Sequence, residues 1–216
     1  MKRIALLLAG SFLLIANVSL SQGIDDRAVI PVAVTLNSIL RLNVTSGGNI
    51  EFNFNTLMDY ENGINTGGLS AAYQTKFNVA SSVNWDVLMY AEDADLIGTD
   101  VITDGGNTAN TMALDNIGYS LASEGDPIDN YYFGTGVTGA SIRPLVEDTD
   151  NLLIGYDGTN TNAGDIYKNS FTINWRCGTA ETGMNTQSIL EQPLAADRYA
   201  TNVFLILEPT NYVAAP

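Results

Sequence analysis

The chain has 216 residues and an acidic composition, with 24 Asp and Glu residues against 9 Lys and Arg and a formal net charge of −15. This charge argues against nucleic acid and anionic membrane surfaces as partners, because both repel an acidic protein. Histidine is absent and Cys177 is the only cysteine. These counts exclude Ser-His-Asp and Cys-His catalysis, an intrachain disulfide and a Cys-x-x-Cys metal or redox site.

The first 22 residues have the layout of a secretory signal peptide. Lys2 and Arg3 form a charged start, residues 4–18 are apolar, and residues 19–22 are small or polar. The apolar run is about fifteen residues, shorter than the ~20 that a membrane-spanning helix needs. We therefore expect residues 1–22 to be removed on export, with a retained single-span anchor as the alternative. The mature protein is expected in the periplasm, at the outer surface or outside the cell.

Residues 23–216 read as one β-domain. Apolar residues recur there with a period of two, between clusters rich in Gly, Asn, Asp and Thr. The pattern predicts an all-β fold, an antiparallel β-sandwich of Ig-like or pilin-like type with about nine or ten strands. A jelly roll or a barrel is the alternative. With 45% hydrophobic and 15% charged residues, the chain can build a packed core.

The first predicted strand covers residues 28–36, whose apolar side chains share one face. Pro31 cannot donate to a ladder, so this strand belongs at a sheet edge or begins there. The segment is therefore either an edge strand of its own chain or a strand that pairs with the open sheet edge of a neighbouring subunit. The candidate assembly residues are Val29, Ile30, Val32, Val34 and Leu36.

Four strands are predicted next. Residues 40–45 alternate apolar and polar side chains and lead into a turn at residues 46–49. Residues 50–55 alternate even more clearly and predict an amphipathic strand with a solvated polar face. Residues 73–79 and 83–89 are predicted to form a hairpin pair.

The second half of the chain alternates between polar regions and apolar strands. Residues 92–110 are predicted to be loop, and a short strand is expected at 152–156. Residues 171–177 alternate strictly and place Trp175 and Cys177 on a core face, where the thiol is expected to be buried and inert. Trp85 is likewise expected in the core.

The last strand, residues 199–208, is apolar on both faces through Val203 to Leu207. Such a run predicts a strand whose two faces are both covered by neighbours.

Two acidic loops are candidate metal sites. The loop from Glu147 to Asp165 places carboxylates and amides at short spacing, and calcium takes six to eight oxygen ligands. Its candidate ligands are Asp148, Asp150, Asp157 and Asp165. The second loop holds Glu92, Asp93, Asp95 and Asp100. The alternative in both cases is ordinary turn chemistry, because Asp and Asn bond their own backbone and tolerate left-handed conformations.

Two further functions, glycoside hydrolysis and sugar binding, each have a simpler alternative. Paired carboxylates can hydrolyse a glycoside, but no pair stands out here, so we expect no enzyme. Exposed tyrosines can stack on sugar rings, which makes Tyr131 and Tyr132 candidate ligand residues. The alternative is that these rings close one end of the sandwich.

Three stretches resemble the pilin-like sandwiches of bacterial surfaces, in particular the spore-coat-U type and related fimbrial domains. They are NIEFNFN from Asn49, MALDNIGYSL from Met112 and YATNVFLILEP from Tyr199. The Gln22 near the end of the signal and the Asn-rich strands also resemble exported proteins of Bacteroidetes-type bacteria. This resemblance implies secreted subunits that assemble into fibres or coats, often by one chain adding a strand to a neighbour's sheet.

The function expected from the sequence is that of a non-enzymatic exported structural or adhesive surface protein, a subunit of an extracellular or envelope assembly. Its partners would be other protein subunits, either copies of itself or envelope proteins. The alternative is a module that binds carbohydrate or another ligand, with a calcium-ordered loop. No cofactor is expected other than this calcium, and no membrane span beyond the signal.

Overall fold

A computed structural model describes residues 30–65, 71–101, 108–125, 141–156, 158 and 161–210. It divides the chain into two units, Met1–Leu36 and Asn37–Pro216. Of the first unit, only residues 30–36 are described, and they form neither helix nor strand. The second unit is the β-domain.

The described part of the β-domain contains twelve strands in three antiparallel sheets. The six-stranded sheet holds β1 (Leu40–Ser46), β2 (Ile64–Asn65), β3 (Gln74–Ser81), β7 (Ile117–Ser123), β8 (Arg143–Pro144) and β10 (Ser170–Cys177). One three-stranded sheet holds β4 (Trp85–Ala91), β9 (Leu152–Ile154) and β12 (Val203–Pro209). The other holds β5 (Asp95–Val101), β6 (Ala109–Ala113) and β11 (Tyr199–Ala200).

The strand order within each sheet differs from the order of the strands in the sequence. The six-stranded sheet runs β1-β3-β10-β7-β8, with β2 also paired to β10, and the two smaller sheets run β12-β4-β9 and β11-β5-β6. This arrangement confirms the predicted all-β, antiparallel, sandwich-like fold. None of the three sheets closes on itself within the described residues, as the barrel alternative would require.

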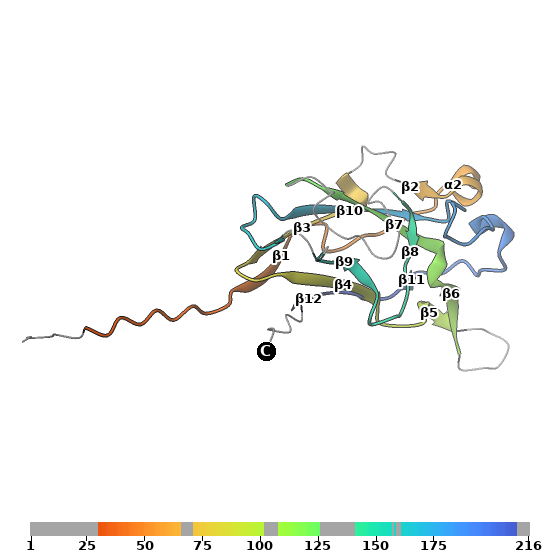
Figure 1. Cartoon of the computed structure of the whole chain (residues 1–216). Coiled ribbons are helices and arrows are strands. Elements are labelled where there is room, and N and C mark those ends of the chain that lie inside the picture. The colour runs from red at the N-terminus through yellow and green to blue at the C-terminus, as the bar shows by residue number, and fades with distance from the viewer. Residues whose placement is uncertain are drawn as a thin grey trace, which may run out of the picture. The chain divides into compact units, whose positions relative to one another are not determined.

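The core lies between the six-stranded sheet and the sheet of β4. In Figure 1, β3 and β10 form the upper layer, and β4 and β12 lie below them. Alternate residues of β3 and β4 are buried in this space. Phe77 and Phe171 are neighbours on β3 and β10 of one sheet, with ring centroids 5.4 Å apart, and Trp85 of β4 meets Phe171 across the core at 6.0 Å. Trp85, Trp175 and Cys177 are buried, as predicted. Burial raises the pKa of the Cys177 thiol to about 12, so the thiol stays protonated.

The strand predicted at residues 50–55 is not formed. Ile50, Phe52 and Phe54 do pack against the core at alternate positions, but these residues join no ladder. The chain continues into the short helix α2 (Leu57–Asn62), whose first turn is closed by a capping box between Thr56 and Asp59. Alternation with a period of two therefore shows here that one face of an extended chain is buried. It does not show that the chain is hydrogen-bonded to a neighbouring strand.

The predicted hairpin between residues 73–79 and 83–89 is also wrong. Both segments are strands, but β3 belongs to the six-stranded sheet and β4 to the sheet facing it. The chain crosses between the layers after β3, where the Ser81 hydroxyl donates to Val83 O and accepts from Val83 N at 3.1 Å. Two strands that face one core across a sandwich show the same alternation as two that pair within one sheet, so the pattern could not separate them.

Two other elements differ from their prediction. The predicted loop at residues 92–110 contains β5 and the start of β6, because the Asp, Gly and Thr residues of β5 give this strand the composition of a loop. The predicted last strand splits into β11 and β12, which lie in different sheets. The two faces of β12 are not both covered, since Phe204 and Ile206 on its outer side are each 38% exposed. Three short 3₁₀ turns complete the described elements: η1 (Ala71–Tyr73), η2 (Leu114–Asn116) and η4 (Ile189–Glu191).

Asn162 fastens the long loop before β10 to the start of β4. Its side chain is almost fully buried, accepts from Trp85 N at 3.1 Å and donates to Trp85 O at 2.7 Å. Its own backbone oxygen accepts from the indole of the same tryptophan at 2.8 Å. Asn162 thus satisfies buried backbone groups at the edge of the core.

We predict that Asn162→Ala lowers the free energy of unfolding by about 2–4 kcal/mol, because it leaves a buried N–H and a buried C=O of Trp85 without these partners. Urea unfolding followed by tryptophan fluorescence measures this loss. Asn43→Ala, on the exposed side of β1, is the matched control and should change stability by less than about 0.5 kcal/mol. Equal effects of the two substitutions would contradict the role of Asn162.

Candidate functional site

Two of the residues predicted to bind calcium, Asp148 and Asp165, accept hydrogen bonds from the backbone of their own loops. Asp148 Oδ1 accepts from the backbone N of Asp150 at 3.0 Å, and Asp165 Oδ1 accepts from the backbone N of Tyr167 at 3.0 Å and of Lys168 at 3.2 Å. Asp157 lies outside the described residues. Among the residues that the structure describes, no group of three or more carboxylate or thiol side chains is placed to hold a metal ion. The described bonds are those of ordinary Asx turns.

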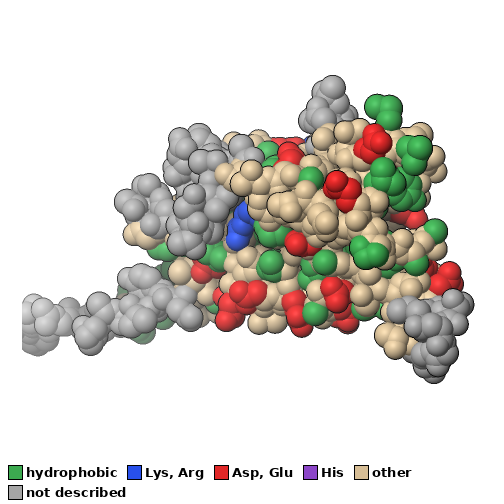
Figure 2. All heavy atoms as spheres, turned by 90° about the vertical axis from the view of Figure 1, so that its right-hand side faces the viewer, with side chains coloured by type: hydrophobic (Ala, Val, Ile, Leu, Met, Phe, Trp, Pro, Cys, Tyr) green, Lys and Arg blue, Asp and Glu red, His purple; other side chains and the backbone are tan. Residues whose placement is uncertain are grey.

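The second acidic loop is part of the sheet framework. Asp95 and Asp100 lie in β5, while Glu92 follows β4 and accepts a hydrogen bond from the amide of Asn202. Asp93 accepts from Thr201 Oγ1 at 3.3 Å. The carboxylates of Glu92 and Asp93 thus hold the residues that lead into β12. Figure 2 shows acidic side chains scattered over the viewed face, without a single acidic cleft.

The carboxylate with the most hydrogen-bond donors was not singled out from the sequence. Asp197 precedes β11 and accepts from the Thr99 hydroxyl at 2.7 Å, from the Asn110 amide at 3.0 Å and from the backbone N of Thr99, Asp100 and Arg198. The bonds from Thr99 and Asn110, followed by those from the backbone, hold the pKa of Asp197 well below its usual range. A carboxylate that accepts so many hydrogen bonds from its own chain connects β11, β5 and β6, and is not placed to act as a catalytic acid.

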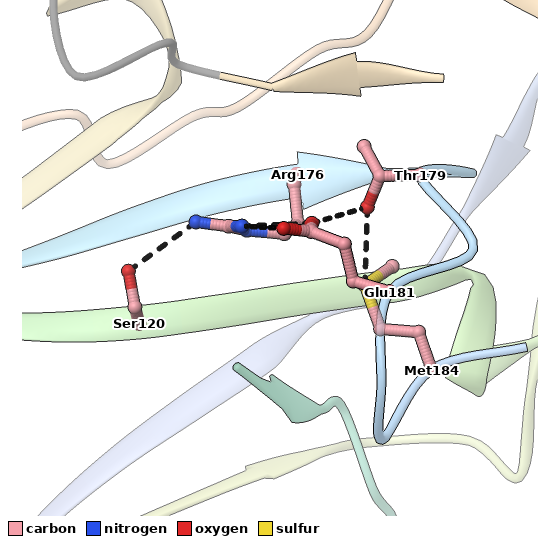
Figure 3. Close-up of polar contacts among 5 residues, drawn as sticks. All are labelled: Ser120, Arg176, Thr179, Glu181 and Met184. Atoms are coloured by element: carbon pink, nitrogen blue, oxygen red, sulfur yellow. Dashed lines mark hydrogen bonds and ion pairs between the residues drawn. The ribbon is translucent and has the colours of Figure 1, made fainter. Parts of the chain in front are cut away.

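Arg176 and Glu181 form the best-developed charged contact (Figure 3). Arg176 Nη1 lies 2.7 Å from both carboxylate oxygens of Glu181, and Thr179 Oγ1 donates to the same carboxylate at 2.6 Å. Partial burial acts to raise the pKa of Glu181, but the hydrogen bonds from Thr179 and Arg176 outweigh it, so the pKa lies below its ordinary value. Met184, from the same loop, packs on Gly118, where a β-carbon would collide with its sulfur. The cluster therefore fastens the loop after β10 onto β7.

Two predicted site regions cannot be placed. Tyr131 and Tyr132, the candidate ligand residues, lie outside the described residues, as does Val29. A glycan site at the tyrosines stays a prediction.

The described part of the predicted first strand, residues 30–36, is here called the N-terminal segment. It forms neither helix nor strand, and the four apolar side chains at its alternate positions are 79–90% exposed, namely Ile30, Val32, Val34 and Leu36. Pairing of this segment, within its own chain or with a neighbouring subunit, stays a prediction. Its apolar side chains at alternate positions are the feature on which such pairing would depend.

Two open strand edges lie where β1 and β12 approach each other. Within the described residues, β1 pairs only with β3 and β12 only with β4, and the other edge of each strand makes no backbone hydrogen bond. Their core-facing side chains are incompletely covered. Leu42 and Leu205 are half-buried, whereas Val44 is 41% and Val203 38% exposed. We call this pair of open edges, β1 with β12, the seam.

No protein-family model matches the chain, and no curated protein matches it either. Within the described residues, no helix combines the length and the apolar character needed to cross a bilayer. The chain's own surfaces are therefore the guide to its function.

We predict that Asp197→Asn lowers the urea midpoint at neutral pH, because the amide cannot replace a carboxylate that accepts five hydrogen bonds. The folded pKa is depressed, so the stability that this carboxylate adds is complete above the ordinary value of 3.8 and is lost as the pH falls through the folded pKa. The gap between variant and wild type should therefore close below about pH 4. Unfolding curves over this pH range measure it.

Asp150→Asn, which changes an exposed carboxylate in another loop, is the matched control and should leave the midpoint unchanged at every pH. A gap for Asp197→Asn that stays constant down to the lowest pH would contradict the assignment.

Proposed function

We propose that this chain is an exported, non-enzymatic structural protein of the cell surface or envelope, and that it works as a subunit of a larger assembly. The observation that carries the proposal is the match between the N-terminal segment and the seam. The segment presents apolar side chains at alternate positions, and the seam presents open strand edges with uncovered apolar side chains. The N-terminal segment of one copy would fill the seam of the next.

The chemistry of strand addition supports this pairing. An extended segment beside an open edge gains backbone hydrogen bonds along its length and buries every second side chain. With its four apolar side chains turned inward, the segment would cover Val44, Val203 and the half-buried leucines of the seam. Pro31 lacks an N–H and would forgo one of these backbone bonds.

Charge supports a specific contact. Residues 28–40 and 203–207 contain no charged side chain, although the chain as a whole carries a formal charge of −15. Acidic copies repel one another over most of their surface, so casual association is discouraged. The charged residues of the two seam strands are Arg41 in β1 and Glu208 near the end of β12. The uncharged segment can therefore meet the seam without bringing many carboxylates together. A strand from another envelope protein of the same chemistry would fit the same seam, but the chain's own segment is always available.

We predict that the chain without residues 1–22 forms oligomers whose mass rises with protein concentration, and that Val34→Asp weakens this association about 30-fold or more. The variant would place a carboxylate among apolar side chains, at a cost of about 2 kcal/mol or more. Sedimentation velocity over a concentration series measures the effect. Thr35→Asp adds the same charge at the neighbouring position of opposite parity and is the matched control.

Two results would overturn the proposal. One is a monomer at every concentration in which Val34→Asp lowers the free energy of unfolding, because the segment would then be an edge strand of its own chain. The other is association that Val34→Asp and Thr35→Asp weaken equally, because the alternation of the segment would then play no part.

A further inference from the structure

The outer faces of the two main sheets differ in polarity. The outward side chains of β3 and β10 are mainly polar and bonded to one another: Gln74 Nε2 donates to Asn174 Oδ1 at 2.8 Å, and Lys76 pairs with Glu124 at 2.6 Å. A solvated outer face is expected for an antiparallel sandwich. The six-stranded sheet therefore has the surface of a sheet that faces water.

The outer face of β9, β4 and β12 is apolar instead. Its side chains stand directly opposite one another in register: Leu88 opposes both Ile206 and Leu152, and Tyr90 opposes Phe204 with ring centroids 5.4 Å apart. Phe204 and Ile206 are each 38% exposed, and the other three side chains are half-buried. We call these five residues the apolar outer face. It lies on the side of β12 that points away from the core, so it is distinct from the core-facing side chains of the seam.

Charge at this face is confined to its two ends, and all of it is negative. Asp86 opposes Glu208 at one end of the β4–β12 ladder, and Glu92 lies beyond the other end. Strands β4, β9 and β12 contain no Lys or Arg. The centre of the face is therefore uncharged in a protein whose acidic side chains are otherwise widely spread (Figure 2).

We infer that the apolar outer face is a contact between two copies of this chain, packed face to face about a two-fold axis. A cationic partner would be attracted to the acids spread over the molecule and would have no need of an uncharged patch. Two acidic copies, in contrast, can approach only where like charges are few, and this is the one sheet face with an uncharged apolar centre among the described strands. A two-fold axis lays the apolar centre of one copy on that of the other, as in ordinary sheet-on-sheet packing.

This contact goes beyond the proposed function, because it uses side chains that the seam does not. It is small, with only two residues more than one third exposed, whereas a stable dimer buries about 800 Å² on each partner. We therefore expect a dissociation constant on the order of 10⁻⁴ M for isolated copies. The acids at its ends repel one another, so association should strengthen as salt screens them.

The test uses the Val34→Asp chain, in which the proposed seam contact is blocked. Sedimentation equilibrium at high concentration should show a monomer–dimer equilibrium that tightens as salt is raised. Adding Ile206→Asp should weaken this dimer about tenfold or more, because it places a carboxylate at the centre of the contact. Asn78→Asp adds the same charge on the polar outer face of β3 and should change the association less than about twofold.

A second variant tests proximity without weakening the contact. Ile206→Cys should form an intermolecular disulfide under mild oxidation much faster than Asn78→Cys, since Cys177 is buried and does not compete. Near-ultraviolet circular dichroism, which reports the packing of Trp85 and Trp175, shows whether each variant is folded.

The inference is overturned if folded Val34→Asp protein stays monomeric at every salt concentration, if Ile206→Asp and Asn78→Asp have equal effects, or if the two cysteine variants cross-link at equal rates. If the wild-type chain and Val34→Asp have the same mass in solution, only the proposed seam assembly is contradicted. The contact at the apolar outer face is tested separately, by the comparison of Ile206→Asp with Asn78→Asp.

Discussion

The packing of β4 against β3 and β10 across one apolar core is the interaction on which the rest of the structure depends. A single cysteine rules out an intrachain disulfide, so burial must supply the stability that a cross-link gives many small domains. In this core Phe171 contacts both Phe77 and Trp85, with ring centroids 5.4 Å and 6.0 Å apart. Hydrogen bonds from loop side chains then hold the loops to this core. Asn162 bonds to the backbone of β4 and Asp197 to the backbone of β5, and each side chain satisfies two backbone groups of that strand.

Alternation in the sequence predicted the buried faces of several strands, but not what lies beside them. It identified the core faces of β3, β4 and β10, including Trp85 and Trp175, because one buried face requires a period of two. It could not distinguish the ladder of β10 from the unpaired residues 50–55, since both bury alternate side chains. It also could not reveal that β3 and β4 face each other, because pairing depends on the path of the chain between strands.

The same limit explains the candidate sites. Asp148 and Asp165 were singled out for their acidic neighbours, yet their described bonds go to backbone groups two or three residues away, which is what Asp does in any turn. The sequence did not single out Asp197, because its side-chain donors come from β5 and β6, about 90 residues earlier in the chain. The N-terminal segment was recognised from its apolar alternation alone. Its exposure, and the existence of a seam of matching chemistry, required the structure.

The two proposed contacts have different symmetry, and this determines what they would build together. A segment that fills the seam of another copy is a heterologous contact, which repeats from copy to copy and gives an open chain unless a ring closes. The apolar outer face is isologous and joins only two copies. It is too small to hold isolated copies together, but within an open chain each copy brings its neighbours' faces to high effective concentration. Many weak contacts in register would then pair two chains side by side, with the acidic surface outermost and in water.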